Sequence, residues 1–405
     1  MISLLADSEH DRGRMRGHRR RRLIQKSEVW GAREQGQHAE ELLRSGACHH
    51  PRYADAMSTA DWRSRTVGGV TLLLGGVFAL AAAAAFHPGA IATAGIQGTA
   101  PALERGQRLV IVVWNVQYAA GRSRQFFYDG GPDVHPDPAE AADTLSRIAA
   151  RIAAENPDVV LLQEVDRGST RTGGVDQLAV IAGRAGFPVT ASAPVHRAPW
   201  VPWPPNKHLG RVDTHLGVLS RHHIAQARRV ALPPLPDGWL RQQLDLKRAI
   251  LEVDLPLADG RHMTLMNTHL SAFSNGDGTL ARQVAVLSER LEKTGQTWVC
   301  GGDFNALPPG DDASRLGLAA AEYPEPETPI APLFAAHSSA IPAAEHKRRA
   351  AAWRTWMPWG SHTPERALDH VFMSKDVEML RVSVLTDASD LSDHLPIRVE
   401  VILPR

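Results

Sequence analysis

The chain has 405 residues, of which 43% are hydrophobic and 22% are charged, a composition that excludes a wholly disordered or fibrous protein. From Arg108 onward, 31 Lys and Arg residues stand against 34 Asp and Glu residues, so the basic excess lies in the first 107 residues. This balance gives the larger part of the chain no basic footprint of the kind that DNA-binding domains show. The two cysteines, Cys48 and Cys300, lie in regions of different character and do not indicate a disulfide framework.

Residues 1–56 are basic and polar and show no sustained periodicity. The run RGRMRGHRRRR, from Arg12 to Arg22, is a charge block of a kind that is usually disordered. Two interpretations stay open. Either the run binds nucleic acid or anionic lipid, or translation starts at Met57 and the segment is not made.

Residues 66–86 predict a transmembrane signal anchor. The run TVGGVTLLLGGVFALAAAAAF is uncharged and has roughly the 20 residues that a bilayer-spanning helix requires. Residues 57–65 form the cytoplasmic segment before it, in which Arg63 and Arg65 set the orientation by the positive-inside rule. We therefore expect a single-pass protein of the inner (cytoplasmic) membrane. Its catalytic domain would lie outside the cytoplasm, which is the periplasm in a Gram-negative cell.

A cleaved signal peptide is the alternative, with Ala92 to Ala94 as a small-residue cleavage site. The apolar run is longer than the usual core of about 7–15 residues in a signal peptide, which favours the anchor. Residues 87–107, rich in Ala, Gly and Thr, predict a linker. Residues 108–405 then predict the catalytic domain.

Apolar or alternating runs recur through the predicted catalytic domain and indicate nine strands: RLVIVVWNV, DVVLLQEV, LGVLS, AILEVDL, HMTLMNTHL, WVCGGDFN, DHVFMS, RVSVLT and PIRVEVIL. Helical periodicity is clear at two places only: Leu145, Ile148 and Ile152, and Leu280, Val284, Leu287 and Leu291. A regular alternation of strand and helix would need a helix after nearly every strand. The pattern therefore predicts an α/β fold of two mixed β-sheets packed face to face, flanked by helices.

Polar side chains gather at the ends of these strands, or interrupt them, at six places: Asn115; Glu164; Asn267 and His269; Asp303 and Asn305; Asp369 and His370; Ser392, Asp393 and His394. Any single one could simply cap a loop. Six such places that nearly all supply carboxylate, amide or imidazole make that common explanation improbable. In GGDFNA, an extended chain would direct Asp303 and Asn305 to one side and Phe304 into the opposite layer.

The chemistry open to such a set is narrow. The sequence has no nucleophile elbow, no GxxxxGK[ST] loop and no cysteine-rich zinc pattern. Hard oxygen ligands suit Mg²⁺, with Mn²⁺ as an alternative, because Mg²⁺ keeps several waters and takes further ligands from a phosphate. Imidazoles and amides can hold phosphoryl oxygens while a carboxylate orients an attacking water. The sequence therefore predicts phosphoester hydrolysis, with Asp303 acting on the water and Asn305 beside it.

The ordered motifs WNV, LLQEV, NTHL, GGDFNA, ALDHVFMS and LSDHLPI resemble the endonuclease/exonuclease/phosphatase superfamily. That superfamily includes DNase I, abasic-site endonucleases, inositol polyphosphate 5-phosphatases and neutral sphingomyelinases. The resemblance covers about Arg108 to Val401, and GDFN followed by SDH in this order is highly specific. It implies a four-layer α/β sandwich, here preceded by one transmembrane helix, and metal-dependent hydrolysis of a phosphoric ester.

The resemblance also implies a role for each matched residue. On the metal side, Glu164 would be the main Mg²⁺ ligand, Asn115 would support both metal and phosphate, and Asp393 would add a carboxylate. Abasic-site endonucleases usually carry an Asp two residues after the first Asn, where this chain has Gln117. This departure makes a repair endonuclease less expected and places more of the metal affinity on Glu164.

On the phosphate side, the resemblance implies that His269 contacts the phosphate and that Asp303 serves the nucleophile. Asn305 would steady the water or the phosphate beside it. Asp369 would hydrogen-bond His394, whose ring would stabilise the phosphoryl group in the transition state.

Half of the ten tryptophans lie in the loop-like stretches PWVPWPP and WRTWMPW: Trp200, Trp203, Trp353, Trp356 and Trp359. They could pack against the sheet edges. If they are exposed, they suit a membrane interface, where an apolar ring with one polar end is favoured. We therefore expect membrane or substrate loops here and a lipid-linked or small phosphoester as substrate. NVQYAAGRSRQFFYDGG also resembles the branch associated with remodelling of glycosylphosphatidylinositol lipids.

Two other classes of function stay open. One is an exported nuclease, although the single basic run HKRRA is more typical of a solvated face than of a nucleic-acid site. The other is a catalytically silent binding module, which the intact Glu164, Asp303 and His394 make less expected. The sequence indicates no protein partner.

Overall fold

The computed structural model describes residues 86–405, apart from residues 237, 239–241, 244, 273–275, 296 and 324–326. The predictions for residues 1–56 and 57–65, and for all of segment 66–86 except Phe86, therefore lie outside the described residues. Within the part of the chain that is described, no helix combines the length and the apolar character that a membrane span requires.

Sheet A has seven strands in the described residues. Their order is β1 (Ile91–Thr93), β7 (Gln226–Ala231), β8 (Ala249–Pro256), β9 (His262–His269), β10 (Trp298–Asp303), β12 (Asp369–Met373) and β11 (Ser338–Ser339). Strands β9 and β10 are parallel, and the other neighbours are antiparallel. The carboxyl ends of β9 and β10 therefore meet at one edge, together with the amino ends of β8 and β12.

Sheet B also has seven described strands. Their order is β13 (Glu378–Val384), β14 (Ile397–Ile402), β3 (Arg108–Asn115), β4 (Val159–Asp166), β6 (Gly210–Ser220), β5 (Val189–Val201) and β2 (Gly95–Gly98). Only β3 and β4 are parallel. Both sheets are thus mixed, as the sequence predicts.

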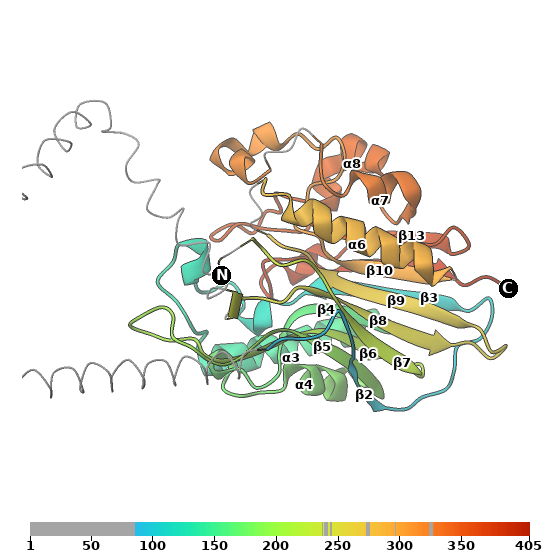
Figure 1. Ribbon diagram of the computed structural model, residues 1–405, viewed down its shortest axis with the longest axis horizontal. Helices are drawn as coiled ribbons and strands as arrows, with labels where there is room; N and C mark the ends of the chain where they lie inside the picture. The colour runs from blue at the N-terminus through green and yellow to red at the C-terminus, as the bar shows by residue number, and fades with distance from the viewer. Residues whose placement is uncertain are drawn as a thin grey trace, which may run out of the picture. The chain divides into compact units, whose positions relative to one another are not determined.

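Helices cover the outer face of each sheet (Figure 1), α3 and α4 lying on one side and α6, α7 and α8 on the other. The helices are α3 (Pro138–Glu155), α4 (Gln177–Ala185), α6 (Thr279–Thr294), α7 (Ala331–Ala336) and α8 (Ala343–Arg349). Short 3₁₀ helices are η3 (Gln117–Ala119), η4 (Phe127–Asp129), η5 (Thr170–Thr172), η6 (Ala313–Glu322), η7 (Ala350–Trp353) and η8 (Thr386–Ala388).

Three buried apolar clusters hold the layers together. The largest lies between the sheets and includes Leu161 of β4 and Val299 of β10. A second packs β3 and β4 against α3 and α4, and a third packs sheet A against α6 and α7. Helix, sheet, sheet and helix form the expected four-layer α/β sandwich. The fold prediction is confirmed.

Helix α3 shows how the sequence fixes one of these layers. Asp137 caps its start by accepting hydrogen bonds from the backbone N–H groups of Ala139 and Glu140. The predicted apolar stripe is buried: Leu145, Ile148 and Ile152 are at most 5% exposed. Burial of this face against sheet B places the loop before α3 beside the carboxyl ends of β3 and β4.

All nine predicted strands are present, together with five that the sequence did not predict: β1, β2, β5, β7 and β11. Two of the five lie within residues 87–107, where we expected a linker. Strand β1 pairs with β7 and β2 pairs with β5, and Leu103 is fully buried between the sheets. This segment therefore belongs to the folded domain. Edge strands of three and four residues are too short to leave a periodic pattern.

Gly302 allows β9 and β10 to approach closely beside the site. Its φ is +154°, and a Cβ atom there would lie 2.0 Å from the carbonyl oxygen of Thr268. We expect Gly302→Ala to lower the free energy of unfolding by about 3 kcal/mol or more, because backbone atoms would have to move. Denaturant unfolding of the purified protein measures this change.

Gly183→Ala is the matched control for that experiment. Gly183 lies in α4, and apart from its neighbours and the backbone of its own helix no atom lies within 4 Å of the position that a Cβ atom would take there. Alanine at this position should be neutral or stabilising by up to about 1 kcal/mol. Equal stability of the two variants would contradict the close approach at Gly302.

Candidate active site

Polar side chains from six segments meet where the carboxyl ends of the parallel strands lie. Asn115 ends β3 and Glu164 lies near the end of β4, while His269 ends β9 and Asp303 ends β10. The other members stand at the amino ends of antiparallel strands: Asp369 begins β12, and Asp393 and His394 precede β14. Strand direction thus brings residues far apart in the sequence to one edge of the sandwich.

Asp303 is the centre of this group and is 1% exposed. Its Oδ2 accepts a hydrogen bond from Asn115 Nδ2 at 3.1 Å, and its Oδ1 accepts one from the backbone N–H of Asn305 at 2.9 Å. The same Oδ2 lies 3.3 Å from His269 Nε2 and 3.5 Å from His394 Nε2. Four groups therefore fix the position of one carboxylate.

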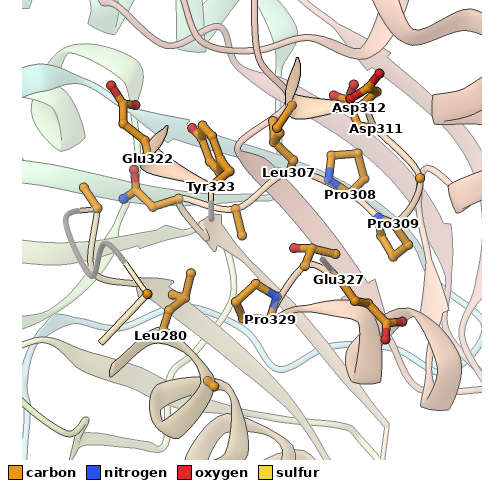
Figure 2. A pocket seen from close by; sticks show the side chains of 18 of the residues that line it. Leu280, Leu307, Pro308, Pro309, Asp311, Asp312, Glu322, Tyr323, Glu327 and Pro329 are labelled. Atoms are coloured by element: carbon orange, nitrogen blue, oxygen red, sulfur yellow. The ribbon is translucent and has the colours of Figure 1, made fainter. Parts of the chain in front are cut away.

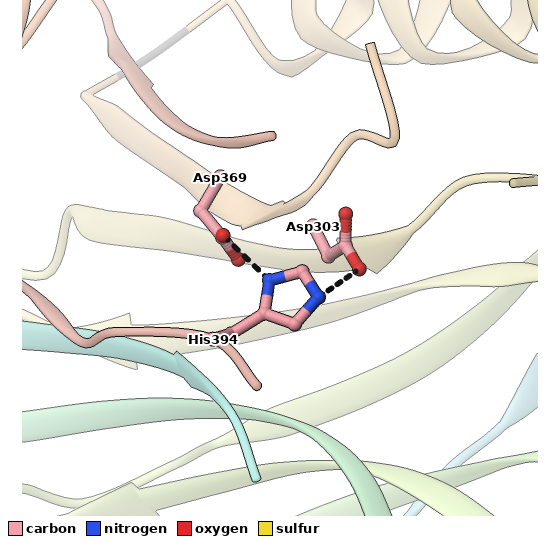
Figure 3. A group of neighbouring side chains, drawn as sticks. All are labelled: Asp303, Asp369 and His394. Atoms are coloured by element: carbon pink, nitrogen blue, oxygen red, sulfur yellow. Dashed lines mark hydrogen bonds and ion pairs between the residues drawn. The ribbon is translucent and has the colours of Figure 1, made fainter. Parts of the chain in front are cut away.

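His394 lies between two buried carboxylates (Figure 3), its ring facing Asp369 on one side and Asp303 on the other. His394 Nδ1 is 2.7 Å from Asp369 Oδ2, which is the hydrogen bond that the resemblance implied. The indole of Trp114 donates to the His394 carbonyl oxygen, and Thr355 Oγ1 accepts from the backbone N–H of Asp369. The ring is thus oriented from both ends.

The charges of this group shift the pKa values of its members in opposite directions. Burial alone would lower the pKa of His394, but Asp369 and Asp303 outweigh it and raise that pKa well above its ordinary value. Burial, together with the charge of Asp369, raises the pKa of Asp303 to about 7 even though His394 opposes the shift. Burial, Arg248 and His394 hold the pKa of His269 well below its ordinary value. A charged and a neutral imidazole therefore face the same carboxylate.

Glu164 presents its carboxylate through a strained turn of the backbone. The pairing of β4 with β6 shifts register between Leu162 and Val165, and Glu164 has a φ of +57° within that bulge. Its side chain is 29% exposed, and Oε1 lies 3.3 Å from Asn115 Nδ2. Burial raises the Glu164 pKa and the charge of Asp393 raises it further, while Arg171, His394 and Arg248 oppose the shift.

The profile of the Endonuclease/Exonuclease/phosphatase family matches residues 112–394, which span the whole of this group. The chain belongs to this family. It is accordingly a phosphoric ester hydrolase, and the predicted resemblance is confirmed.

The chain is also similar to several solved structures. An endonuclease/exonuclease/phosphatase from Beutenbergia cavernae is 22% identical with a TM-score of 0.48, over 73% of this chain and 72% of that one. The human nocturnin catalytic domain with bound sulfate is 18% identical with a TM-score of 0.48, over 76% and 96%. A mannosyl-6-phosphatase from Bacteroides thetaiotaomicron is 17% identical with a TM-score of 0.46, over 73% and 100%. No curated protein matches the sequence.

Two parts of the site offer ligands of the kind that this family's divalent metal ions use. Among the described residues, Asp303, Asp369 and His394 form a buried group whose ligand atoms all lie within 4.8 Å of one another. In that group the imidazole already contacts both carboxylates. On the other side, Glu164 and Asp393 are carboxylates close enough for one to raise the pKa of the other, and the Asn115 amide lies beside Glu164. This second set of hard oxygen donors fits Mg²⁺ well.

Arg248 is a site residue that the sequence analysis missed. It directly precedes β8, whose Ile250 pairs with Thr268 of β9, so its position lies level with the end of β9. Its charge acts on Glu164, Asp303 and His269, and its Nη1 atom is buried without a hydrogen bond. Because β8 runs antiparallel to β9, the residue before β8 reaches the same edge as the residue that ends β9.

Two residues from the predicted strand ends do not reach the site. Asn267 ties the two sheets together by accepting from Gln163 Nε2 at 2.6 Å and donating to the Leu162 carbonyl oxygen. His370 turns away, with its Nε2 2.9 Å from the Ala306 carbonyl oxygen, and packs beside Phe304. Both are buried structural groups.

The geometry at Asn305 differs from the expected extended chain. Strand β10 ends at Asp303, and Asn305 has a φ of +49°. Phe304 does enter the opposite layer, where it packs against Phe372. Asn305 is turned by its own contacts: its N–H donates to Asp303, and its side-chain amide donates to the Leu270 carbonyl oxygen at 3.0 Å.

A left-handed turn follows Asn115, where this chain departs from the abasic-site endonuclease pattern. Gln117, Tyr118 and Ala119 all have φ values between +43° and +56°. The backbone N–H of Gln117 donates to Asn115 Oδ1 at 3.0 Å. This contact fixes the Asn115 amide so that its NH2 group faces Glu164 and Asp303. Gln117 thus orients Asn115 through its backbone.

A pocket of about 450 Å³ adjoins Asn305. Figure 2 shows its lining, in which Leu280 and Pro329 lie on the opposite side from Asp311 and Asp312, and Glu322 and Tyr323 stand together. The pocket therefore offers apolar and acidic surface next to the residue that would hold the nucleophile.

The five tryptophans of the two stretches divide into two kinds. Trp200 and Trp359 are 53% and 49% exposed. Trp203 and Trp353 are partly buried against apolar clusters, and Trp356 stacks on the guanidinium of Arg366 at 4.3 Å. Trp200 and Trp359 are thus the two of the five whose rings are largely exposed.

Proposed function

We propose that this chain is a Mg²⁺-dependent phosphodiester hydrolase that acts at a membrane surface on a lipid-linked or other small phosphoester, with Mn²⁺ as an alternative ion. The observation that carries the proposal is His394, a charged imidazole set between Asp369 and Asp303 and facing the carboxylate that would act on water. Such a group suits a reaction in which negative charge builds up on a phosphoryl group.

The residues divide the reaction between them. Asp303 accepts a proton from the attacking water, whose oxygen bonds to phosphorus while the bond from phosphorus to the leaving oxygen breaks. The leaving oxygen keeps the electron pair of that bond and takes a proton from solvent. Asn305 steadies the water beside Asp303. His394 and the neutral His269 donate hydrogen bonds to the phosphoryl oxygens, and Arg248 adds a positive charge on the same side.

Glu164, Asn115 and Asp393 would hold the Mg²⁺ ion. When bound there, the ion neutralises phosphoryl charge as a Lewis acid. Asn115 has a second task, because its amide also donates to Asp303 and so links the two halves of the site.

The exposed tryptophans support a membrane-facing site. Asp166 of β4 pairs with Thr214 of β6, and Val201 of β5 pairs with Gly210, so the β5–β6 turn that follows Trp200 extends from the edge that bears the site. Trp359 lies in a loop joined to the one after β3, since Arg122 donates to the Pro358 carbonyl oxygen. Both tryptophans therefore lie on segments that adjoin the edge of the sandwich bearing the site, which supports a membrane contact there.

An exported nuclease is the second candidate, and the balance of −3 beyond residue 107 does not favour it. A substrate panel separates the candidates: the purified protein with Mg²⁺ or Mn²⁺ is offered phospholipids, sphingomyelin, inositol phosphates, abasic DNA and plasmid DNA. We expect turnover of a lipid or small phosphoester. Faster turnover of plasmid DNA than of every lipid would favour the nuclease, and no turnover of any ester would leave a silent binding module.

We expect replacement of Trp200 and Trp359 by alanine to weaken binding to phospholipid vesicles while sparing turnover of a small soluble phosphodiester, because both rings are exposed. Vesicle co-sedimentation and a hydrolysis assay measure the two effects. Leu380→Ala is the control, since Leu380 is 42% exposed on β13. Unchanged vesicle binding of the double variant would contradict the membrane contact.

We also propose that the domain lies outside the cytoplasm, anchored by segment 66–86. Arg63 and Arg65 precede that uncharged run and favour this orientation. A reporter that is active only in the cytoplasm, fused after Arg405, should stay silent in cells that make the full chain. Strong reporter activity would overturn the export proposal.

A further inference from the structure

A second, basic pocket of about 330 Å³ lies on the edge that bears the site. Three segments line it: the loop before α3, the turn after β4 and the tip of the β5–β6 hairpin. Four nitrogen-bearing side chains contribute to its wall: Arg124, His135, Arg171 and Lys207. The charge of this pocket contrasts with that of the acidic pocket beside Asn305.

Most of the opposing negative charge is already engaged. The Asp137 carboxylate, which also lines the pocket, caps α3 and accepts from two backbone N–H groups. Arg124 is largely neutralised by Glu140 at 3.2 Å. Lys207 differs, because its ammonium has neither a hydrogen bond nor an ion pair among the described residues. The Lys207 ammonium and the Arg171 guanidinium therefore line one cavity.

Arg171 connects this pocket to the active site. Its guanidinium pairs with Asp166 through Nε and Nη2, at 2.8 and 3.0 Å, and stacks on the Tyr118 ring at 3.7 Å. Asp166 is two residues beyond Glu164, and the charge of Arg171 acts to lower the Glu164 pKa. Lys207 and Arg171 in turn both act to lower the pKa of His135, so these three side chains lie close together.

We propose that this basic pocket binds a second phosphate group, carried by the same substrate molecule or by a neighbouring lipid headgroup, while the first phosphate occupies the active site. The inference rests on the proposed function for the first phosphate. Lys207 makes the charge-assisted contact, and the guanidinium of Arg171, which also lines the pocket, adds positive charge beside it.

The test compares non-hydrolysable phosphonates by calorimetry, using the full chain with Mg²⁺. Propane and hexane bisphosphonates carry two anionic groups at different spacings, and hexylphosphonate carries one. At least one bisphosphonate should bind about tenfold or more tightly than hexylphosphonate, the gain expected for one charge-assisted contact. Lys207→Gln should remove most of that gain. Lys375→Gln, an exposed lysine on the turn between β12 and β13, should keep it.

A vesicle arm identifies the source of the second phosphate. Loss of binding to phosphatidic acid vesicles in Lys207→Gln, without any bisphosphonate gain in the unaltered protein, would assign the pocket to a lipid headgroup. No bisphosphonate gain and no dependence of vesicle binding on Lys207 would overturn the inference.

Turnover of bis(p-nitrophenyl) phosphate separates this inference from the proposed function. Lys207→Gln should leave that turnover unchanged, because Lys207 lies outside the catalytic group. If turnover is absent but a bisphosphonate still binds more tightly than hexylphosphonate, the proposed function is refuted and the pocket is supported. If turnover is normal but neither bisphosphonate binding nor vesicle binding depends on Lys207, the pocket alone is refuted.

Discussion

Asp303→Asn should lower turnover of a phosphodiester by about 10²- to 10⁴-fold, the usual contribution of a general base. Asparagine has nearly the volume of aspartate, and its single oxygen can still accept one of the two hydrogen bonds that the carboxylate accepts from Asn115 and from the Asn305 N–H, so the fold should survive. It cannot take the proton of the attacking water. Steady-state kinetics with saturating Mg²⁺ measure the loss, and circular dichroism checks the fold.

Asn267→Asp is a matched control for a carboxamide–carboxylate exchange on the adjacent strand. Asn267 is fully buried between the sheets, where it donates to two carbonyl oxygens. That exchange should lower the free energy of unfolding by about 1–3 kcal/mol or more, because hydrogen bonds are lost.

If Asp303→Asn keeps more than about a tenth of normal turnover, the role assigned to Asp303 is wrong.

His394→Ala should reduce turnover by about 10²-fold or more, and added Mg²⁺ should not restore it, because His394 stabilises the phosphoryl group and does not hold the ion. Glu164→Gln provides the contrast. Loss of its negative charge should raise the Mg²⁺ concentration required for half-maximal turnover, so that added metal partly rescues it. A Mg²⁺ titration of both variants beside the unaltered protein measures the difference.

Asp369→Asn extends the test to the group that orients His394. Its amide keeps an oxygen near His394 Nδ1 but removes the charge that raises the His394 pKa. In a pH profile of turnover, the decline on the alkaline side should therefore begin at a lower pH than in the unaltered protein, because His394 loses its proton more readily.

In the Mg²⁺ titration, rescue of His394→Ala by Mg²⁺ would show that the imidazole serves the metal, contrary to the role assigned to it.

The fold could be predicted largely because its central strands are buried on both faces. Runs such as VVLL in β4 and VIVV in β3 are continuously apolar and can be recognised directly in the sequence. Strand β5 was missed because its thirteen residues include two prolines, a histidine and an arginine. Its place depends on pairing with β6, which a local pattern cannot reveal. Strands β1 and β2 were missed because three or four residues are too few to leave a periodic pattern.

The site could be predicted where a polar residue ends an apolar run, as at Asn115 and Asp303. Arg248 could not be found in that way, because it precedes its strand and reaches the site only through antiparallel pairing with β9. Asn267 is the converse case, since it ends a similar run but faces the sheet opposite. Lys207 and Arg171 meet because three loops converge, which requires the folded chain.

Hydrolysis of bis(p-nitrophenyl) phosphate by the full chain, measured with excess EDTA and then with added Mg²⁺, tests the central claim most directly. The account predicts that turnover is absent with EDTA, returns with Mg²⁺, and falls by about 10²-fold or more in Asp303→Asn prepared in the same way. Turnover that persists in EDTA, or that is equal in the unaltered protein and in Asp303→Asn, would contradict a metal-dependent hydrolase built around this carboxylate.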